Sequence, residues 1–281
     1  MCEAKKYVME NTEGLIADNK RLWETWTSFH YESAFYDIDG FKKGKDTLAS
    51  PELEVLGEVQ GKSILHLQCH MGLDTLSLAR RGALPVGVDI SEKSIQSARD
   101  LAEELNLEAK FIACNLYDLP KTLEQQFDIV FTSYGTIYWI PDLKSWSEII
   151  FRYLKPGGMF LIVEFHPFMR IFKDSGENWE PSFPYFHKDQ PYTRETLCTY
   201  AGVITPPRTA HVWAHPLSEV MNSLVEVGLE IRFFKEYPYS TRQYCLGMKQ
   251  REDGFWIPLE SSVDIPCLYA LKAIKKIQSL G

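Results

Sequence analysis

Short apolar runs alternate with segments whose apolar residues recur at helical spacing between residues 63 and 164. Each run has the length and the turn-forming flanks of a buried β-strand, and each intervening segment is long enough for a helix. This alternation predicts a doubly wound, parallel α/β sheet. The expected strands are residues 63–67, 84–89, 110–114, 127–132 and 159–164.

The ends of the expected helices carry their usual signals. Ser91 is placed to cap a helix that has Ile95 and Ala98 on one face. Gly82 follows a helix over residues 73–81, because glycine readily adopts the left-handed conformation at a helix end. These boundaries support the assignment of the flanking strands.

The regular alternation stops at residues 166–213, which contain many aromatic residues and several prolines. A segment of this length without periodicity is usually functional or disordered, and so many rings argue against disorder. We therefore expect an aromatic insertion after the fifth strand that forms a substrate lid. The alternation resumes with a helix over residues 216–227 and strands over 229–234 and 267–274, which completes a seven-stranded, Rossmann-like sheet.

Aromatic residues are also dense in residues 1–59, which precede the first strand. We expect this segment to cap a ligand pocket, although packing onto the main domain would also account for the rings. The chain of 281 residues is then a single domain. It consists of the N-terminal cap, a core made of residues 60–165 and 214–281, and the insertion.

The formal net charge of −8 bears on the choice of partner. Nucleic acid and anionic membranes attract a basic face, so we expect neither, and we expect a small molecule instead. Neither a secretory signal nor a membrane-spanning segment is expected. The six cysteines are scattered and form no CxxC pair, which is typical of reduced thiols in a cytoplasmic protein. Nothing in the sequence specifies an oligomeric state.

Residues at the ends of the first two strands carry candidate chemistry. The turn at residues 68–72 joins a strand directly to a helix, whose free N–H groups can face a carboxylate or phosphate. Asp89, at the end of the second strand, is placed to accept hydrogen bonds from both hydroxyls of a ribose. Together they predict a nucleoside-containing ligand. A nicotinamide-dependent oxidoreductase would have one, but the GxGxxG fingerprint is missing.

Two further segments change this interpretation. Asn115 and Leu116 follow the third strand, where a polar side chain can reach an adenine edge. The sequence Leu-Lys-Pro-Gly-Gly at residues 154–158 ends a helix and leads into the fifth strand. With these motifs in this order, the chain resembles the class I S-adenosylmethionine-dependent methyltransferases that act on small molecules. The resemblance covers residues 60–165 well and residues 214–275 more loosely.

The resemblance implies methyl transfer from S-adenosyl-L-methionine to a small molecule, with S-adenosyl-L-homocysteine as the product. It places the ribose on Asp89, the adenine on Asn115 and Leu116, and the methionyl end on the turn after the first strand. The implied cofactor-binding residues are His66, Gln68, Cys69, His70, Gly72, Asp74, Thr75, Asp89, Ile90, Asn115, Leu116, Ser133 and Tyr134.

The first turn departs from the family pattern. His66 stands where the family has an acid, and Gln68 and His70 stand where it has glycines. Histidine tolerates a left-handed backbone, so His70 is compatible with the turn, and the amide of Gln68 is expected to narrow the cleft or to bind the methionyl carboxylate. His66, Cys69 and His70 also resemble a metal cluster. We expect no metal there, because adjacent residues point in different directions and no fourth ligand is near.

Methyl transfer asks for little covalent chemistry, because the sulfonium is already a good electrophile. A base is needed only when the acceptor arrives protonated. His166, just past the fifth strand, is the candidate for that base or for a substrate ligand, with a histidine bonded locally to the backbone as the alternative. The expected substrate-binding residues are Tyr36, Tyr138, Trp139, Trp213 and His215, with ordinary hydrophobic packing as their alternative.

The motifs leave open the acceptor and whether its N, O, S or C atom is methylated. Two other functions also stay open. One is a nicotinamide-dependent oxidoreductase, and the other is a protein that binds S-adenosylmethionine without catalysis.

Overall fold

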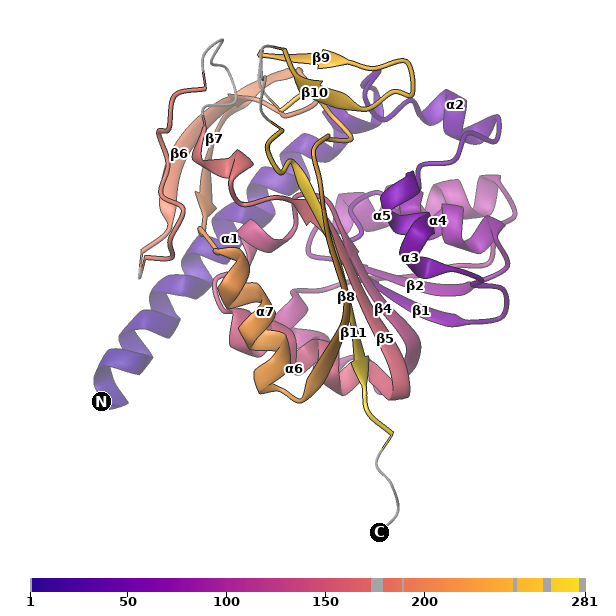
Figure 1. The fold of residues 1–281 in the computed structure, drawn as a ribbon, viewed down its shortest axis with the longest axis horizontal. Helices are drawn as coiled ribbons and strands as arrows, with labels where there is room; N and C mark the ends of the chain where they lie inside the picture. The colour runs from indigo at the N-terminus through magenta and orange to yellow at the C-terminus, as the bar shows by residue number, and fades with distance from the viewer. Residues whose placement is uncertain (1, 173–178, 189, 245–246, 260–263, 278–281) are drawn as a thin grey trace.

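A computed structural model describes residues 2–172, 179–188, 190–244, 247–259 and 264–277. Within these residues, seven strands form one central sheet in the order β3-β2-β1-β4-β5-β11-β8 (Figure 1). This confirms the predicted seven-stranded α/β architecture. The strands are β1 (Ser63–Leu67), β2 (Leu84–Asp89), β3 (Lys110–Ala113), β4 (Phe127–Ser133), β5 (Leu154–Phe165), β8 (Leu229–Tyr237) and β11 (Leu268–Lys275).

Strands β1 to β5 pair in parallel, as predicted. Strand β11 instead runs antiparallel to both of its neighbours, β5 and β8. The expectation of an all-parallel sheet is therefore wrong at this edge. Antiparallel neighbours need no crossover helix, and the chain between β8 and β11 has none in its described residues.

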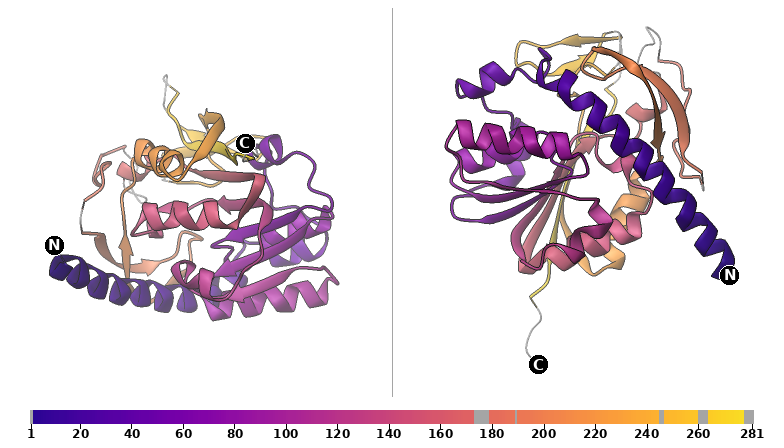
Figure 2. Two further views of the ribbon diagram at one scale, coloured as in Figure 1. Left: turned by 90° about the horizontal axis from the view of Figure 1, so that it is seen from below. Right: turned by 180° about the vertical axis from the view of Figure 1, so that it is seen from behind.

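Helices cover both faces of the sheet, as two views of the ribbon show (Figure 2). On one face Leu65 packs in a cluster with Trp146 of α6 (Leu143–Tyr153) and with α7 (Leu217–Glu226). Its neighbour Ile64 points to the opposite face, which α3 (Ser50–Leu56) and α4 (Leu73–Arg80) cover. Helix α5 (Glu92–Glu104) packs beside α4. This alternation of successive side chains is what a sheet buried on both faces requires.

Strand β5 begins at Leu154, so the turn expected at residues 155–158 lies inside it and causes a shift in its register with β4. Gly158 is tightly enclosed there. A Cβ atom at this position would lie 2.8 Å from the carbonyl oxygen of Lys155 and 3.1 Å from that of Phe127. The chain therefore needs glycine where the strand meets the end of α6.

The N-terminal segment forms a long helix, α1 (Cys2–Tyr31). The insertion, expected to be irregular, contains an antiparallel hairpin of β6 (Tyr192–Cys198) and β7 (Ile204–Val212). Helix α1 runs along this hairpin (Figure 2). Asn19 fixes the contact, because its amide donates to the carbonyl of His211 (2.7 Å) and accepts the N–H of the same residue (2.9 Å). The cap and the insertion therefore support each other.

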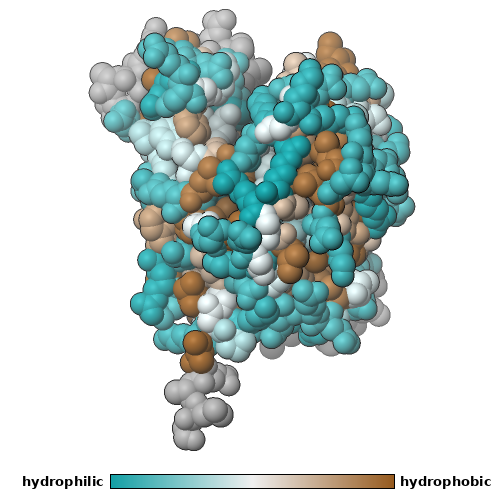
Figure 3. Space-filling view, turned by 90° about the vertical axis from the view of Figure 1, so that its right-hand side faces the viewer, coloured by the Kyte–Doolittle hydropathy of each residue, from teal (hydrophilic) through white to brown (hydrophobic). Residues whose placement is uncertain are grey.

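Shorter elements complete the fold. They are α2 (Ile38–Lys42), the 3-10 turns at Leu116–Lys121, Ile137–Trp139 and Met169–Ile171, and a small ribbon of β9 (Met248–Gln250) and β10 (Trp256–Pro258). Among the described residues, no helix has the length and apolarity needed to span a membrane. On the face shown in Figure 3, hydrophilic residues dominate and apolar residues appear in separate groups among them.

Candidate functional site

A cavity of about 680 Å³ lies where the carboxyl ends of β1, β2 and β4 meet the N-terminal segment and the insertion. Open α/β sheets bind their ligands at this edge. The cavity is lined by the turn after β1, by Asp89 and Ile90 after β2, and by residues 114–117 and 133–136. The nucleoside site and the substrate wall expected from the sequence thus face one space.

The turn after β1 is built on left-handed backbone. Gln68, His70 and Gly72 have φ angles of 54°, 49° and 72°. Only Gly72 is confined by its surroundings as well, since a Cβ atom there would lie 2.6 Å from the Phe111 ring. The turn therefore needs glycine at position 72, where β3 packs against it. Positions 68 and 70 face the cavity and α1, and they have room for the side chains of Gln68 and His70.

His70 connects this turn to the N-terminal helix. Its Nε2 lies 3.0 Å from Nδ1 of His30 in α1, and its Nδ1 lies 2.9 Å from the hydroxyl of Ser94 in α5. Burial lowers the pKa of both imidazoles, that of His30 to about 3, so both rings are neutral and one N–H···N hydrogen bond joins them. This explains why a histidine stands at a glycine position of the turn.

His66 has an internal role at the base of the cavity. Its Nδ1 lies 2.8 Å from the Thr75 hydroxyl and its Nε2 lies 3.4 Å from the Ser133 hydroxyl. Burial lowers its pKa to about 3, so the ring is neutral. Ser133 also donates to Asp74 (2.9 Å), whose pKa burial raises. His66 and His70 thus serve separate networks and do not converge on a shared ion.

Asp89 lines the cavity with both carboxylate oxygens held in place. Oδ2 accepts the N–H of His70 and Oδ1 accepts that of Ser91, each at 2.9 Å. Burial still dominates and raises the pKa of Asp89 to about 6. Asn115 lies nearby on the cavity wall, and its Oδ1 accepts the N–H of Tyr117 (3.2 Å). The amide group of Asn115 is therefore oriented with its Nδ2 left to donate to a ligand.

A buried carboxylate, Glu164, organises the loop after β4. It accepts the backbone N–H groups of Gly135, Thr136 (2.7 Å) and Ile137 (3.0 Å), and that of Phe165 (2.7 Å). These donors fix the loop that carries part of the cavity wall. The sequence indicated only His166, two positions further on, as a candidate base. The role of Glu164 as an anchor depends on a contact between neighbouring strands that no local motif reveals.

The other wall of the cavity combines rings from distant segments. The hydroxyl of Tyr36, from the N-terminal segment, contacts the hydroxyl of Tyr200, from the insertion. The guanidinium of Arg242 lies 4.7 Å from the Phe165 ring centroid and 5.3 Å from that of Tyr200. The guanidinium of Arg170 lies 3.5 Å from the Tyr138 ring centroid. All of these residues line the cavity.

The residues of this wall that were missed from the sequence include Trp23, Arg170, Tyr200 and Arg242. They come from four separate segments and share no spacing. The many aromatic residues in the cap and the insertion indicated that these segments contribute to the pocket. They could not indicate which individual residues line it. Of the predicted substrate residues, Tyr36, Tyr138 and Trp139 do line the cavity.

The remaining predicted residues lie elsewhere. Thr75 supports His66 and is not part of the cavity lining. Trp213 and His215 line a smaller neighbouring cavity of about 80 Å³, which shares Tyr138, Phe165 and Arg170 with the main one. His166 lines neither cavity: its Nδ1 accepts the N–H of Phe168 (3.1 Å) and its Nε2 lies 2.9 Å from Glu236. This position corresponds to the local role that was the alternative to catalysis.

Comparisons with known proteins identify the family of the chain. Residues 58–214 match the family model described as "Methyltransferase domain". The chain belongs to this family. A demethylmenaquinone methyltransferase of Lactococcus lactis subsp. lactis is 31% identical over 186 residues, which are 63% of this chain and 69% of that protein. The resemblance inferred from the motifs is confirmed.

Two other similarities are more limited. A ubiquinone biosynthesis O-methyltransferase of Alkalilimnicola ehrlichii is 34% identical over 105 residues, 37% of this chain and only 42% of that protein. The solved structure of an S-adenosylmethionine-dependent methyltransferase from Clostridium acetobutylicum aligns with 89% of this chain over 98% of its own length. The TM-score is 0.56 and the sequence identity is 13%. The methyltransferase fold therefore extends well beyond the segment that the curated relatives match.

Proposed function

We propose that the protein transfers a methyl group from S-adenosylmethionine to a small molecule and releases S-adenosylhomocysteine. The position of Asp89 carries this proposal. Its two oxygens each accept one backbone N–H and line the cavity, and each carboxylate oxygen can accept a further hydrogen bond. Two ribose hydroxyls would supply those donors, with the adenine at Asn115 and Leu116.

Gln68 suits the methionyl end of the cofactor. Its Nε2 donates to the carbonyl of Thr136 (3.2 Å), which leaves Oε1 facing inward as an acceptor. That oxygen is buried and has no hydrogen-bond partner within the described residues. A buried acceptor without a partner is costly, and the ammonium of the methionyl group would satisfy it. Gln68 is thus assigned to the ammonium, in place of the two roles expected from the sequence, which were to narrow the cleft or to bind the methionyl carboxylate.

The acceptor side favours a molecule with a flat, apolar body and an anionic group. The aromatic side chains of Tyr36, Tyr138 and Phe165 line this side of the cavity. Arg242 lies over two of the wall's rings, and none of the ion pairs found among the described residues involves its guanidinium. A carboxylate or phosphate on the acceptor would pair with it.

The reaction then depends on alignment and on exclusion of water. The cap and the insertion meet at the cavity through the Tyr36–Tyr200 contact. We expect this contact to help keep solvent away from the sulfonium. A nucleophile that arrives with a free lone pair needs no protein base. His166 is not proposed as a base, because both of its ring nitrogens have partners outside the cavity. The cytoplasmic location expected from the scattered cysteines stays a prediction.

Calorimetry with the full chain tests the cofactor, with S-adenosylmethionine and NADH as separate titrants. We expect binding of S-adenosylmethionine only, and binding of NADH alone would favour an oxidoreductase. Mass spectrometry then follows S-adenosylhomocysteine across a panel of aromatic carboxylates and their neutral amides. Cofactor binding without product in either arm of the panel would identify a non-catalytic binder.

Arg242→Met tests the acceptor chemistry. Loss of one charge-assisted hydrogen bond costs about 1.5–3 kcal/mol, so KM for carboxylate acceptors should rise by roughly 10- to 100-fold. The KM for neutral acceptors and the affinity for S-adenosylmethionine should not change. Arg232→Met is the matched control, since Arg232 pairs with Glu230 on the exposed side of β8. Equal effects on carboxylates and amides would contradict an anion site at Arg242.

A further inference from the structure

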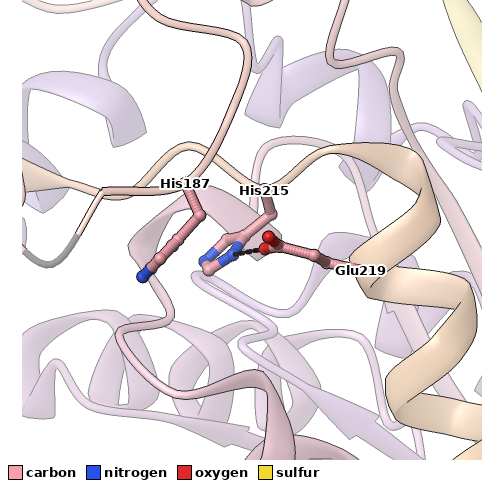
Figure 4. A group of neighbouring side chains, drawn as sticks. All are labelled: His187, His215 and Glu219. Atoms are coloured by element: carbon pink, nitrogen blue, oxygen red, sulfur yellow. Dashed lines mark ion pairs between the residues drawn. The ribbon is translucent and has the colours of Figure 1, made fainter.

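Away from the main cavity, the fold brings together His187, His215 and Glu219 (Figure 4). One ligand atom from each residue lies within 4.8 Å of the other two. His187 belongs to the insertion, whereas His215 and Glu219 flank the start of α7 in the core, four positions apart. Because 28 residues separate the two histidines in the chain, no sequence spacing indicated the cluster, and we expected no metal site.

Hydrogen bonds fix the protonation of both imidazoles. Nε2 of His215 lies 2.6 Å from the carbonyl oxygen of Ile140, and Nδ1 of His187 lies 3.1 Å from that of Ala214. A carbonyl oxygen only accepts, so each of these nitrogens carries a hydrogen, and the other nitrogen of each neutral ring has a lone pair. Imidazoles that bind metals are held in this way, with the non-ligating N–H donated to a backbone carbonyl.

The lone pair on Nδ1 of His215 has no hydrogen-bond partner among the described residues, although the side chain is only 1% exposed. It faces a carboxylate oxygen of Glu219 at 3.9 Å, as Figure 4 shows. Two acceptors that face each other need a donor or a cation between them.

The spacing suits a metal ion. Zinc binds nitrogen and carboxylate oxygen at roughly 2.0–2.2 Å, so two tetrahedral ligand atoms lie about 3.4 Å apart. A small rotation of Glu219 closes the remaining difference, and its side chain is 46% exposed, so it can rotate and admit an ion from solvent. The two rings are nearly parallel, with an interplanar angle of 19° and centroids 5.3 Å apart. In Figure 4 the outer ring nitrogen of His187 points away from Glu219, so the partly exposed His187 ring must turn to bring its free lone pair to the ion.

We propose that His187, His215 and Glu219 form a site for one divalent transition-metal ion, with Zn²⁺ as the best match to two imidazoles and a carboxylate. A solvent molecule completes its coordination. The ion joins the insertion to the first turn of α7 and so holds the insertion against the core. It lies beside the smaller cavity, to which His215 contributes.

Metal titration of the full, untagged chain tests this site. After chelator treatment and dialysis, calorimetry with ZnCl₂ should give one ion per chain, and Co²⁺ should give the visible absorption of a four-coordinate ion. The midpoint of thermal unfolding should rise with the concentration of Zn²⁺, because the ion binds only the folded site. Failure of both ions to bind in a one-to-one ratio would overturn the proposal.

Ligand variants locate the ion. His187→Ala and Glu219→Gln should each weaken Zn²⁺ binding by at least 100-fold while leaving the circular dichroism spectrum unchanged, since neither side chain is fully buried. Glu226→Gln, at the other end of α7, and His211→Ala, at the contact with α1, are the controls and should bind Zn²⁺ like the original chain. Binding of unchanged strength in both ligand variants would place the ion elsewhere and overturn the assignment.

Discussion

The two halves of the main cavity are assembled in different ways. The proposed cofactor half comes from consecutive units of the sheet, namely the turn after β1, the end of β2 and the segment after β3. The proposed acceptor half collects Tyr36, Tyr138, Arg170, Tyr200 and Arg242 from five separate parts of the chain. The first half is therefore specified by local backbone geometry, and the second by how distant segments pack.

The two halves therefore place different requirements on their residues. The cofactor half depends on particular conformations, such as the left-handed turn at residues 68–72, and on one carboxylate. The acceptor half depends on two segments closing against each other. Glu164 belongs to both, because it fixes the loop after β4 that lies between them.

Removal of the Glu164 carboxylate should therefore have the largest effect. Glu164→Ala leaves several buried backbone N–H groups without an acceptor, at about 1–3 kcal/mol each, so we expect a loss of roughly 3–5 kcal/mol in the free energy of unfolding. Denaturant unfolding measures it. Glu164→Gln keeps one acceptor oxygen and should lose less. A loss below about 1 kcal/mol in the alanine variant would show that the loop does not depend on this anchor.

Asp89→Asn should affect the cofactor half alone. The substitution keeps the size of the side chain but replaces one acceptor oxygen with a donor, so affinity for S-adenosylmethionine should fall by about 1–3 kcal/mol in calorimetry. The KM of the acceptor should stay within about twofold, because Asp89 accepts its hydrogen bonds from His70 and Ser91, which belong to the cofactor half. If the acceptor's KM rose as much as the cofactor's Kd, the two halves would not be separable.

The contrast also explains how much the sequence alone could predict. The boundaries of the helices between the strands, the positions of all seven strands of the central sheet and the turn with Asp89 follow from periodicity and from short motifs, because these depend on neighbours in the chain. Tyr200 and Arg242 could not be identified in this way. Their roles arise from contacts with residues far away in the sequence, and a hairpin was not expected where Tyr200 lies, between β6 and β7.

His166 and His215 show a related limit, because a position in the chain does not determine which way a side chain points. Both were placed at the substrate because they follow a strand or precede a helix at the correct end of the sheet. The structure places them outside the main cavity, since Glu236 on β8 and the carbonyl of Ile140 pair with their rings. Their positions at the end of the sheet indicated only that they lie near the site. The hydrogen-bonding partner on a neighbouring element determines which way each ring faces.

The smallest predicted effect concerns the junction of the two halves, where His30 of α1 meets His70 of the turn. Burial lowers the folded-state pKa of His30 to about 3, below its ordinary value of 6.5. Its neutral form therefore contributes stability that is present above pH 6.5 and is lost as the pH falls, because the unfolded chain then binds a proton that the folded chain excludes. One such proton changes the free energy of unfolding by at most about 1.4 kcal/mol per pH unit.

His30→Gln keeps a polar partner for His70 without titrating, so its stability should fall less steeply between pH 6 and pH 4, by about 1 kcal/mol per pH unit. Denaturant unfolding of both chains at each pH measures the difference, and the contribution of Asp89, common to both, cancels. Parallel pH profiles would mean that His30 is accessible to protons in the folded chain and that the cap does not seal against the cofactor turn.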